Sequence, residues 1–157
     1  MTIEVGFRAP AFDLETDTGR ASLDALKGKA VVLYFYPKDD TPGCTNEGKD
    51  FSALLPEFHK VGAVVIGCSK DSVKAHAKFR AKYDLKVELA SDPEGKTIEA
   101  YGSWVEKSLY GRQYMGIDRS TFVIDGSGAV RAVWHKVKVA GHAEAVLKAV
   151  QELRTAA

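Results

Sequence analysis

The chain has 157 residues, of which 45% are hydrophobic and 27% charged, and its formal net charge is +1. This size and composition are typical of one globular domain, so we expect a single domain over residues 1–157. A charge so close to zero gives no electrostatic reason to expect nucleic acid or an anionic membrane as a partner.

Cysteine content and apolar patterning suggest the compartment. Two cysteines are too few for a disulfide framework, which favours a reducing environment. The longest apolar stretches, Ala30–Tyr36 and Val61–Cys68, fall far short of the roughly 20 residues that span a bilayer. The first six residues lack the basic and apolar blocks of a signal peptide. We therefore expect a cytoplasmic protein.

Apolar runs and helical spacing organise the first half of the chain. Continuous runs of β-branched and aromatic residues are typical of strands buried on both faces of a sheet. The i, i+3, i+4, i+7 spacing of Phe51, Leu54, Leu55 and Phe58 indicates an amphipathic helix. In chain order we predict a hairpin from Ala11–Glu15 and the turn Asp17–Arg20, a helical turn over Ser22–Gly28, a strand over Ala30–Tyr36, a helix after the loop Pro37–Gly43, and a strand over Val61–Cys68.

The second half alternates helices and strands and then ends with a hairpin and a helix. The tetrapeptide Asp125–Gly128 is a strong hairpin signal. Asp71 is a plausible N-cap for the helix that follows it. In chain order we predict a helix from Asp71 to Tyr83, a short strand over Val87–Ala90, a helical turn over Lys96–Tyr101, a loop over Ser103–Gly116, strands over Ser120–Asp125 and Ala129–His135, and a last helix from Gly141 to Arg154.

This order of elements predicts an α/β fold. Alternating strands and helices imply a parallel portion covered on both faces, to which the late hairpin adds antiparallel strands. The result is a thioredoxin-like fold, a central mixed sheet flanked by helices with an added N-terminal β-hairpin. Chemistry in such sheets gathers at the carboxyl ends of the strands. Cys44 follows one central strand and Cys68 ends the other, so the two thiols could share one edge.

Cys44 lies where the strand Ala30–Tyr36 is expected to turn into a helix. A helix N-terminus stabilises negative charge, so a cysteine in the first turn is biased toward the reactive thiolate. The Thr41 hydroxyl is near enough in sequence to bond the sulfur or an incoming oxygen, and Pro37 could wall off one side of a pocket. The pattern favours a nucleophile over a small loop residue without identifying what it attacks.

The same residues match a known family. The run Phe35–Thr45, with its proline and with threonine three residues before the cysteine, resembles the active-site signature of peroxiredoxins. Extended to Glu47 and Phe51, it is similar to the peroxiredoxin Q branch, also called bacterioferritin comigratory proteins. The segments Gly116–Asp125 and Trp134–Ala143 resemble the family's arginine-bearing strand and its C-terminal strand and helix.

The resemblance implies a thiol-dependent peroxidase for hydrogen peroxide and organic hydroperoxides. Cys44 would become a sulfenic acid while Thr41 and backbone amides hold the peroxide oxygens. Arg119, otherwise interpretable as a surface arginine, would stabilise the thiolate and the leaving oxygen. Glu47 would orient Arg119 or serve only as a carboxylate favoured by the helix dipole. The resemblance also implies a monomer, with a dimer as the alternative, and we expect no cofactor.

The sequence departs from the family at the resolving cysteine, the second thiol that reduces the sulfenic acid. Its two usual positions hold Lys49 and Arg80. We therefore expect a one-cysteine mechanism, with thioredoxin, glutaredoxin or a small-molecule thiol as reductant. Cys68 is either a small buried hydrophobe or a less favoured resolving thiol that acts after the helix locally unwinds.

Other functions fit the sequence less well. A disulfide reductase needs a Cys-x-x-Cys motif, a cysteine hydrolase needs a paired histidine, and a metal site needs clustered ligands; the chain shows none of these patterns. The alternative from another class is a non-catalytic thioredoxin-like binding module, acting as a holdase or a redox-sensing partner.

Overall fold

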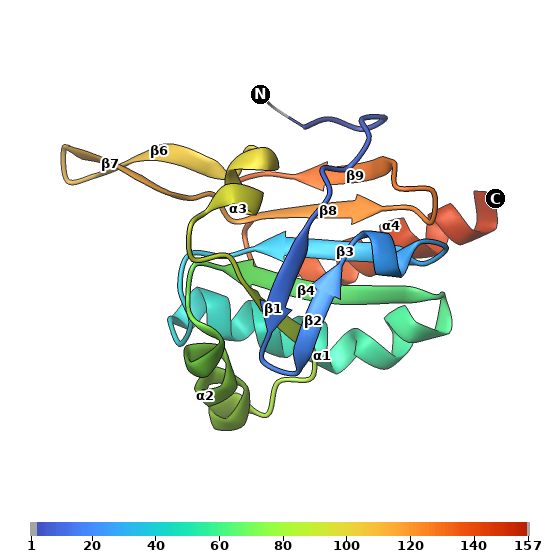
Figure 1. Ribbon diagram of the computed structural model, residues 1–157, viewed down its shortest axis with the longest axis horizontal. Helices are drawn as coiled ribbons and strands as arrows, with labels where there is room; N and C mark the ends of the chain where they lie inside the picture. The colour runs from blue at the N-terminus through green and yellow to red at the C-terminus, as the bar shows by residue number, and fades with distance from the viewer. Residues whose placement is uncertain (1–2, 157) are drawn as a thin grey trace.

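A seven-stranded mixed sheet forms the centre of the computed structural model, which describes residues 3–156 (Figure 1). The three central strands β5, β4 and β3 are parallel, and the outer strands pair antiparallel. This confirms the predicted thioredoxin-like arrangement with its N-terminal hairpin. The strands in sheet order are β2 (Gly19–Ser22), β1 (Asp13–Thr16), β5 (Glu88–Ser91), β4 (Ala63–Ser69), β3 (Ala30–Phe35), β8 (Ser120–Ile124) and β9 (Val130–Trp134).

Helices cover both faces of this sheet and give it two apolar cores. The first core packs Phe51, Phe79 and Val146 of three helices against one face, and the second packs the N-terminal segment and a short helix against the other. No helix in the described part of the chain has the length and apolar character to cross a membrane. The helices are the 3-10 helix η1 (Asp24–Leu26), α1 (Pro42–Lys60), α2 (Val73–Tyr83), α3 (Lys96–Ala100) and α4 (His142–Ala156).

Strand alternation decides which side chains face each core. Successive residues of a strand point to opposite faces, so Tyr34 joins the core beneath α1 while Phe35 joins the other. Cys68 pairs in register with Phe35 and shares its face. A Cβ at Gly67 would lie 2.6 Å from the Tyr34 ring, so only glycine lets this ring lie across β4.

The predicted loop over Ser103–Gly116 is wrong, because this segment forms a hairpin. Strands β6 (Trp104–Leu109) and β7 (Arg112–Ile117) pair antiparallel and project from the body of the molecule (Figure 1). Tyr110 and Gly111 make its tight turn, with φ of 50° and 77°. Most side chains of the hairpin are exposed, so the apolar alternation that usually reveals a strand is missing.

The predicted N-cap at Asp71 is also wrong. The cap of α2 is Ser72, whose hydroxyl oxygen accepts a hydrogen bond from the Ala75 amide at 3.1 Å. The Asp71 carboxylate instead accepts from the Ser69 hydroxyl at 2.7 Å and from the Asp39 amide at 2.9 Å. Asp71 therefore ties the end of β4 to the loop that precedes α1.

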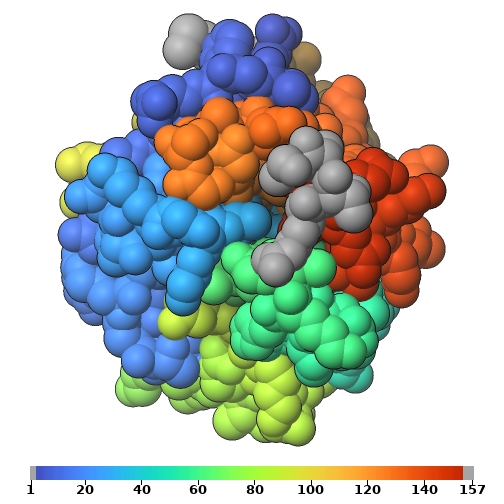
Figure 2. Space-filling model, turned by 90° about the vertical axis from the view of Figure 1, so that its right-hand side faces the viewer, coloured from blue at the N-terminus to red at the C-terminus, as the bar shows by residue number. Residues whose placement is uncertain are grey.

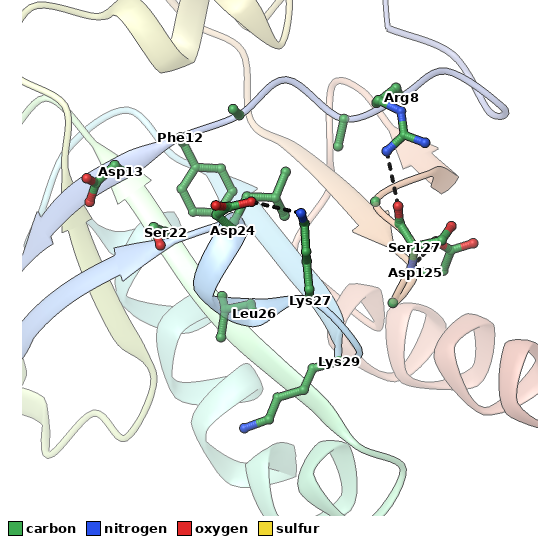
Figure 3. A pocket seen from close by; sticks show the side chains of 15 residues that line it. Arg8, Phe12, Asp13, Ser22, Asp24, Leu26, Lys27, Lys29, Asp125 and Ser127 are labelled. Carbon is green, nitrogen blue, oxygen red and sulfur yellow. Dashed lines mark hydrogen bonds and ion pairs between the residues drawn. The ribbon is translucent and has the colours of Figure 1, made fainter.

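The end of the molecule opposite the start of α1 carries two hollows. Figure 2 looks onto this end, where the β8–β9 turn (orange) meets the end of α1 (green) and α4 (red). A hollow of about 770 Å³ lies here beside Phe12 and Lys27, with Arg8 donating to the Ser127 carbonyl oxygen at its rim (Figure 3). A second of about 610 Å³ is lined in part by Val61. Neither contains Cys44.

Candidate active site

Helix α1 begins as predicted, with Cys44 in its first turn. Pro42 is the first helical residue, and Thr41 precedes it in an extended conformation. The Thr41 hydroxyl makes no capping bond and instead donates to the Lys38 carbonyl oxygen at 2.8 Å. The first-turn amides of Gly43 and Cys44 therefore lack a capping acceptor and lie at the positive end of the helix.

Arg119 joins the cysteine to Glu47. It precedes β8, and its Nη2 donates to Cys44 Sγ at 3.3 Å while Nη1 donates to Glu47 Oε1 at 2.7 Å. Burial lowers the pKa of Arg119, but the charges of Cys44 and Glu47 raise it more, so the guanidinium stays charged. One planar fork thus places a fixed positive charge beside a buried sulfur that is 2% exposed.

Gly43 leaves the space that this fork occupies. A Cβ at this position would lie 3.0 Å from Arg119 Nη2, closer than ordinary contact. The structure shows that its small size admits the guanidinium.

Glu47 is a buried carboxyl with one unused oxygen. Its side chain is 1% exposed, and Oε2 has no hydrogen-bond partner among the described residues. Burial raises the pKa of Glu47 to about 7, although the charge and hydrogen bond of Arg119 oppose the rise. Arg119 is therefore the group that stabilises the ionised form of the Glu47 carboxyl.

We expect Glu47→Gln to flatten the pH dependence of stability. The folded state keeps the Glu47 proton up to about pH 7, whereas the unfolded chain releases it near the ordinary pKa of 4.5. Because the folded state binds more protons between these values, the free energy of unfolding falls as pH rises, by up to about 1.4 kcal/mol per pH unit. Urea titrations across this range should show a smaller fall in the variant.

The matched control is Glu57→Gln, which removes a half-exposed carboxylate from the same helix. This variant should keep the pH dependence of the parent chain. A slope that Glu47→Gln leaves unaltered would contradict the raised pKa of Glu47.

Cys44 and Cys68 lie on opposite faces of the sheet. Cys44 belongs to the core beneath α1, whereas Cys68 is fully buried in the other core. Both thiols are free. Burial and the charge of Asp92 raise the pKa of the Cys68 thiol well above its ordinary value. Cys68 is the penultimate residue of β4 and Cys44 lies in the helix that follows β3, so both lie toward the carboxyl ends of the parallel strands, but their side chains belong to cores on opposite faces of the sheet.

Thr41 and Pro37, the remaining predicted site residues, both lie close to the start of α1 in sequence, but neither side chain bonds the sulfur of Cys44. Thr41 lies at the start of α1, with its hydroxyl proton directed to Lys38 rather than to the sulfur. Pro37 follows β3 and is exposed, so its role as a wall stays a prediction. The Lys38 carbonyl is a partner that sequence reasoning missed, because no residue pattern marks a backbone acceptor. No group of three or more potential metal ligands occurs in the described part of the chain.

Comparisons with known proteins agree on one family. Residues 5–133 match the AhpC/TSA family. A protein of Coxiella burnetii named as a peroxiredoxin is 54% identical over 94% of this chain and 98% of its own. Peroxiredoxin Bcp of Bacillus subtilis is 46% identical over 98% of each chain. The solved structure of Xanthomonas campestris bacterioferritin comigratory protein, described for its alkyl peroxide reduction activity, has a TM-score of 0.87 and 48% identity over 91% of this chain and 92% of that one.

Proposed function

The chain belongs to the AhpC/TSA family and is a peroxiredoxin, a thiol-dependent peroxidase, and we propose that Cys44 is its peroxide-reducing thiol. The observation that carries this assignment is the 3.3 Å hydrogen bond from Arg119 to Cys44 Sγ at the start of α1. The guanidinium and the helix N-terminus both place positive charge beside the sulfur, where a nucleophilic cysteine would carry its negative charge. The non-catalytic binding module is set aside, since the relatives are named as peroxiredoxins.

The proposed reaction is a displacement at oxygen. The Cys44 thiolate attacks one peroxide oxygen, so that an S–O bond forms as the O–O bond breaks. The sulfur is oxidised to sulfenic acid, and the leaving oxygen takes a proton and departs as water or as an alcohol. Arg119 faces the sulfur and stabilises the negative charge that moves from sulfur to the leaving oxygen.

Thr41 and the first-turn amides would hold the peroxide. Because the Thr41 hydroxyl donates its proton to Lys38, its oxygen is left with lone pairs that accept the O–H of a hydroperoxide. The amides of Gly43 and Cys44 would donate to the peroxide oxygens. Glu47 would act through Arg119, because it bonds the guanidinium and not the sulfur.

We propose that an external thiol reduces the sulfenic acid. The usual resolving positions are occupied by an exposed lysine and by an arginine engaged in other bonds. Lys49 Nζ lies 5.2 Å from the Tyr83 ring centre, and Arg80 pairs with Asp17 and donates to the Leu85 carbonyl oxygen. Since Cys68 is on the other face of the sheet, thioredoxin, glutaredoxin or a small-molecule thiol would supply the attack.

Mass spectrometry after one equivalent of peroxide tests this mechanism. We expect the parent chain to gain one oxygen on Cys44, trapped as a dimedone adduct, and to form no internal disulfide. Cys68→Ser should turn over peroxide at nearly the parental rate, although its buried hydroxyl costs about 1–3 kcal/mol of stability. A Cys44–Cys68 disulfide that disappears in Cys68→Ser would make Cys68 the resolving thiol.

The proposal extends to substrate and setting. The alkyl peroxide reduction described for the Xanthomonas campestris relative supports organic hydroperoxides as substrates beside hydrogen peroxide. We infer a cytoplasmic setting, since two free cysteines suit a reducing compartment, and we propose a monomer on the family resemblance alone. Sedimentation of the reduced and oxidised forms would test the monomer.

A further inference from the structure

A buried histidine of α2 has no part in the chemistry proposed for Cys44. His76 is fully buried, and its ring contacts the segment between β3 and α1, residues 37–41, which is called the catalytic loop below. Its Nδ1 lies 2.7 Å from Asp39 Oδ2 and its Nε2 lies 2.9 Å from the Ala90 carbonyl oxygen. A buried ring with two such short contacts joins α2, β5 and the catalytic loop.

Both ring nitrogens of His76 face acceptors. A carbonyl oxygen only accepts, so Nε2 carries a proton toward Ala90, and the Asp39 carboxylate accepts from Nδ1 in the same way. The shared proton belongs on the ring, because imidazole is ordinarily more basic than a carboxylate by more than about two pKa units. The two acceptors therefore favour an imidazolium at His76, paired with the Asp39 carboxylate.

The surroundings of His76 favour its charge. Tyr36, directly after β3, donates to the other Asp39 oxygen at 2.6 Å, and its hydroxyl lies 3.5 Å from His76 Nδ1. Asp71, between β4 and α2, adds a second negative charge. Burial lowers the pKa of His76, but the bonds to Asp39 and Ala90 and the charges of Asp39 and Asp71 raise it more, leaving it above its ordinary value.

Two consecutive aspartates fasten the catalytic loop to α2. The Asp39 carboxylate binds His76, and its amide donates to Asp71 at 2.9 Å. Asp40 has a left-handed φ of 60° and pairs with Lys82 Nζ at 2.8 Å. Left-handed backbone is unfavourable outside glycine, so these bonds must hold the turn. Thr41 follows directly and begins α1, so the position of its hydroxyl depends on this turn.

We propose that His76 is a positioning residue for the peroxidase reaction, holding the Asp39 carboxylate as a buried imidazolium and thereby fixing the catalytic loop that places Thr41 beside Cys44. The inference rests on the function proposed for Cys44. When His76 loses its proton, it keeps only one of its two hydrogen bonds, the one to Asp39 of the catalytic loop or the one to Ala90 of β5, and the link between the loop and β5 is broken. Thr41 then no longer holds the peroxide in line with the sulfur.

Nitrogen-15 NMR of the parent chain tests the charge directly. We expect both ring nitrogens of His76 to keep the chemical shifts of protonated imidazolium to a higher pH than those of an ordinary histidine. The ring signals of His76 are identified as those that are missing from the spectrum of His76→Gln. A neutral ring below pH 7 would overturn the proposal, whatever the variants do.

Kinetics of a double-mutant cycle test the positioning role. His76→Gln and Asp39→Asn should each lower the second-order rate constant for peroxide by about 10- to 100-fold at pH 7, because small misplacements of reacting groups have effects of this size. The double variant should lose no more than either single one. Losses that multiply would contradict the proposal, as would an unaltered rate in His76→Gln. His59→Gln, an exposed histidine of α1, should react as the parent chain does.

Two further readouts separate this inference from simpler explanations. Circular dichroism and thermal unfolding identify variants that fail to fold. If a variant does not fold, the NMR result on the parent chain decides whether the proposal about His76 holds. Above the pH at which the His76 signals titrate, the parental rate constant should fall toward that of His76→Gln. If Cys44 of the parent chain forms no sulfenic acid, the proposed function fails; if it does and His76→Gln reacts normally, only the role of His76 fails.

Discussion

Peroxidase turnover should fall by roughly 10⁴-fold or more when Cys44 is replaced by serine, because the reaction loses its nucleophile. Serine is nearly isosteric with cysteine, so the core beneath α1 should remain packed around the 2%-exposed side chain. A hydroxyl is a far weaker nucleophile than a thiolate and forms no sulfenic acid. Stopped-flow measurements with hydrogen peroxide and with an alkyl hydroperoxide would give both rate constants.

The control for this prediction is Cys68→Ser, which makes the same change on the opposite face of the sheet. Thermal unfolding should show both variants folded, and only Cys44→Ser should fail to form the dimedone adduct. Turnover by Cys44→Ser at a parental rate would transfer the chemistry to another group and refute the assigned nucleophile.

Arg119→Met should lower the second-order rate constant for peroxide by about 10²–10³-fold, the usual effect of removing one preorganised donor from a developing charge. The variant loses the bond to Cys44 Sγ at 3.3 Å and the bond to Glu47 at 2.7 Å. Without Arg119, neither oxygen of the buried Glu47 carboxyl has a hydrogen-bond partner. Stability should fall by at most about 3–5 kcal/mol, and less wherever Glu47 takes up a proton.

A second substitution separates the catalytic loss from the structural one. In Arg119→Met with Glu47→Gln, no buried charge is left behind, so stability should recover while the rate constant stays low. Arg119→Lys keeps the charge but lacks the fork that reaches both partners, so we expect an intermediate rate. Recovery of the rate in the double variant would show that Arg119 acts only by neutralising Glu47.

Patterns of neighbouring residues are enough to predict the position of Cys44. The apolar run over Ala30–Tyr36 and the helical spacing that starts at Phe51 are enough to place Cys44 at the start of a helix, as the structure shows. The resemblance then supplied Arg119, which is 75 residues away along the chain. The hairpin at Tyr110–Gly111 was missed, because strands that cover no core show no apolar alternation.

The sequence by itself determined the order of elements apart from the hairpin of β6 and β7, the place of Cys44 at the start of α1 and the family's chemistry, because those depend on neighbouring residues and on a contiguous motif. The tertiary structure decided the rest. Strand register put Cys68 on the face away from Cys44, since one position along a strand reverses the direction of a side chain. Likewise, only the packing of α2 against the catalytic loop brings His76 to Asp39, 37 residues away along the chain, and gives a buried histidine its partner.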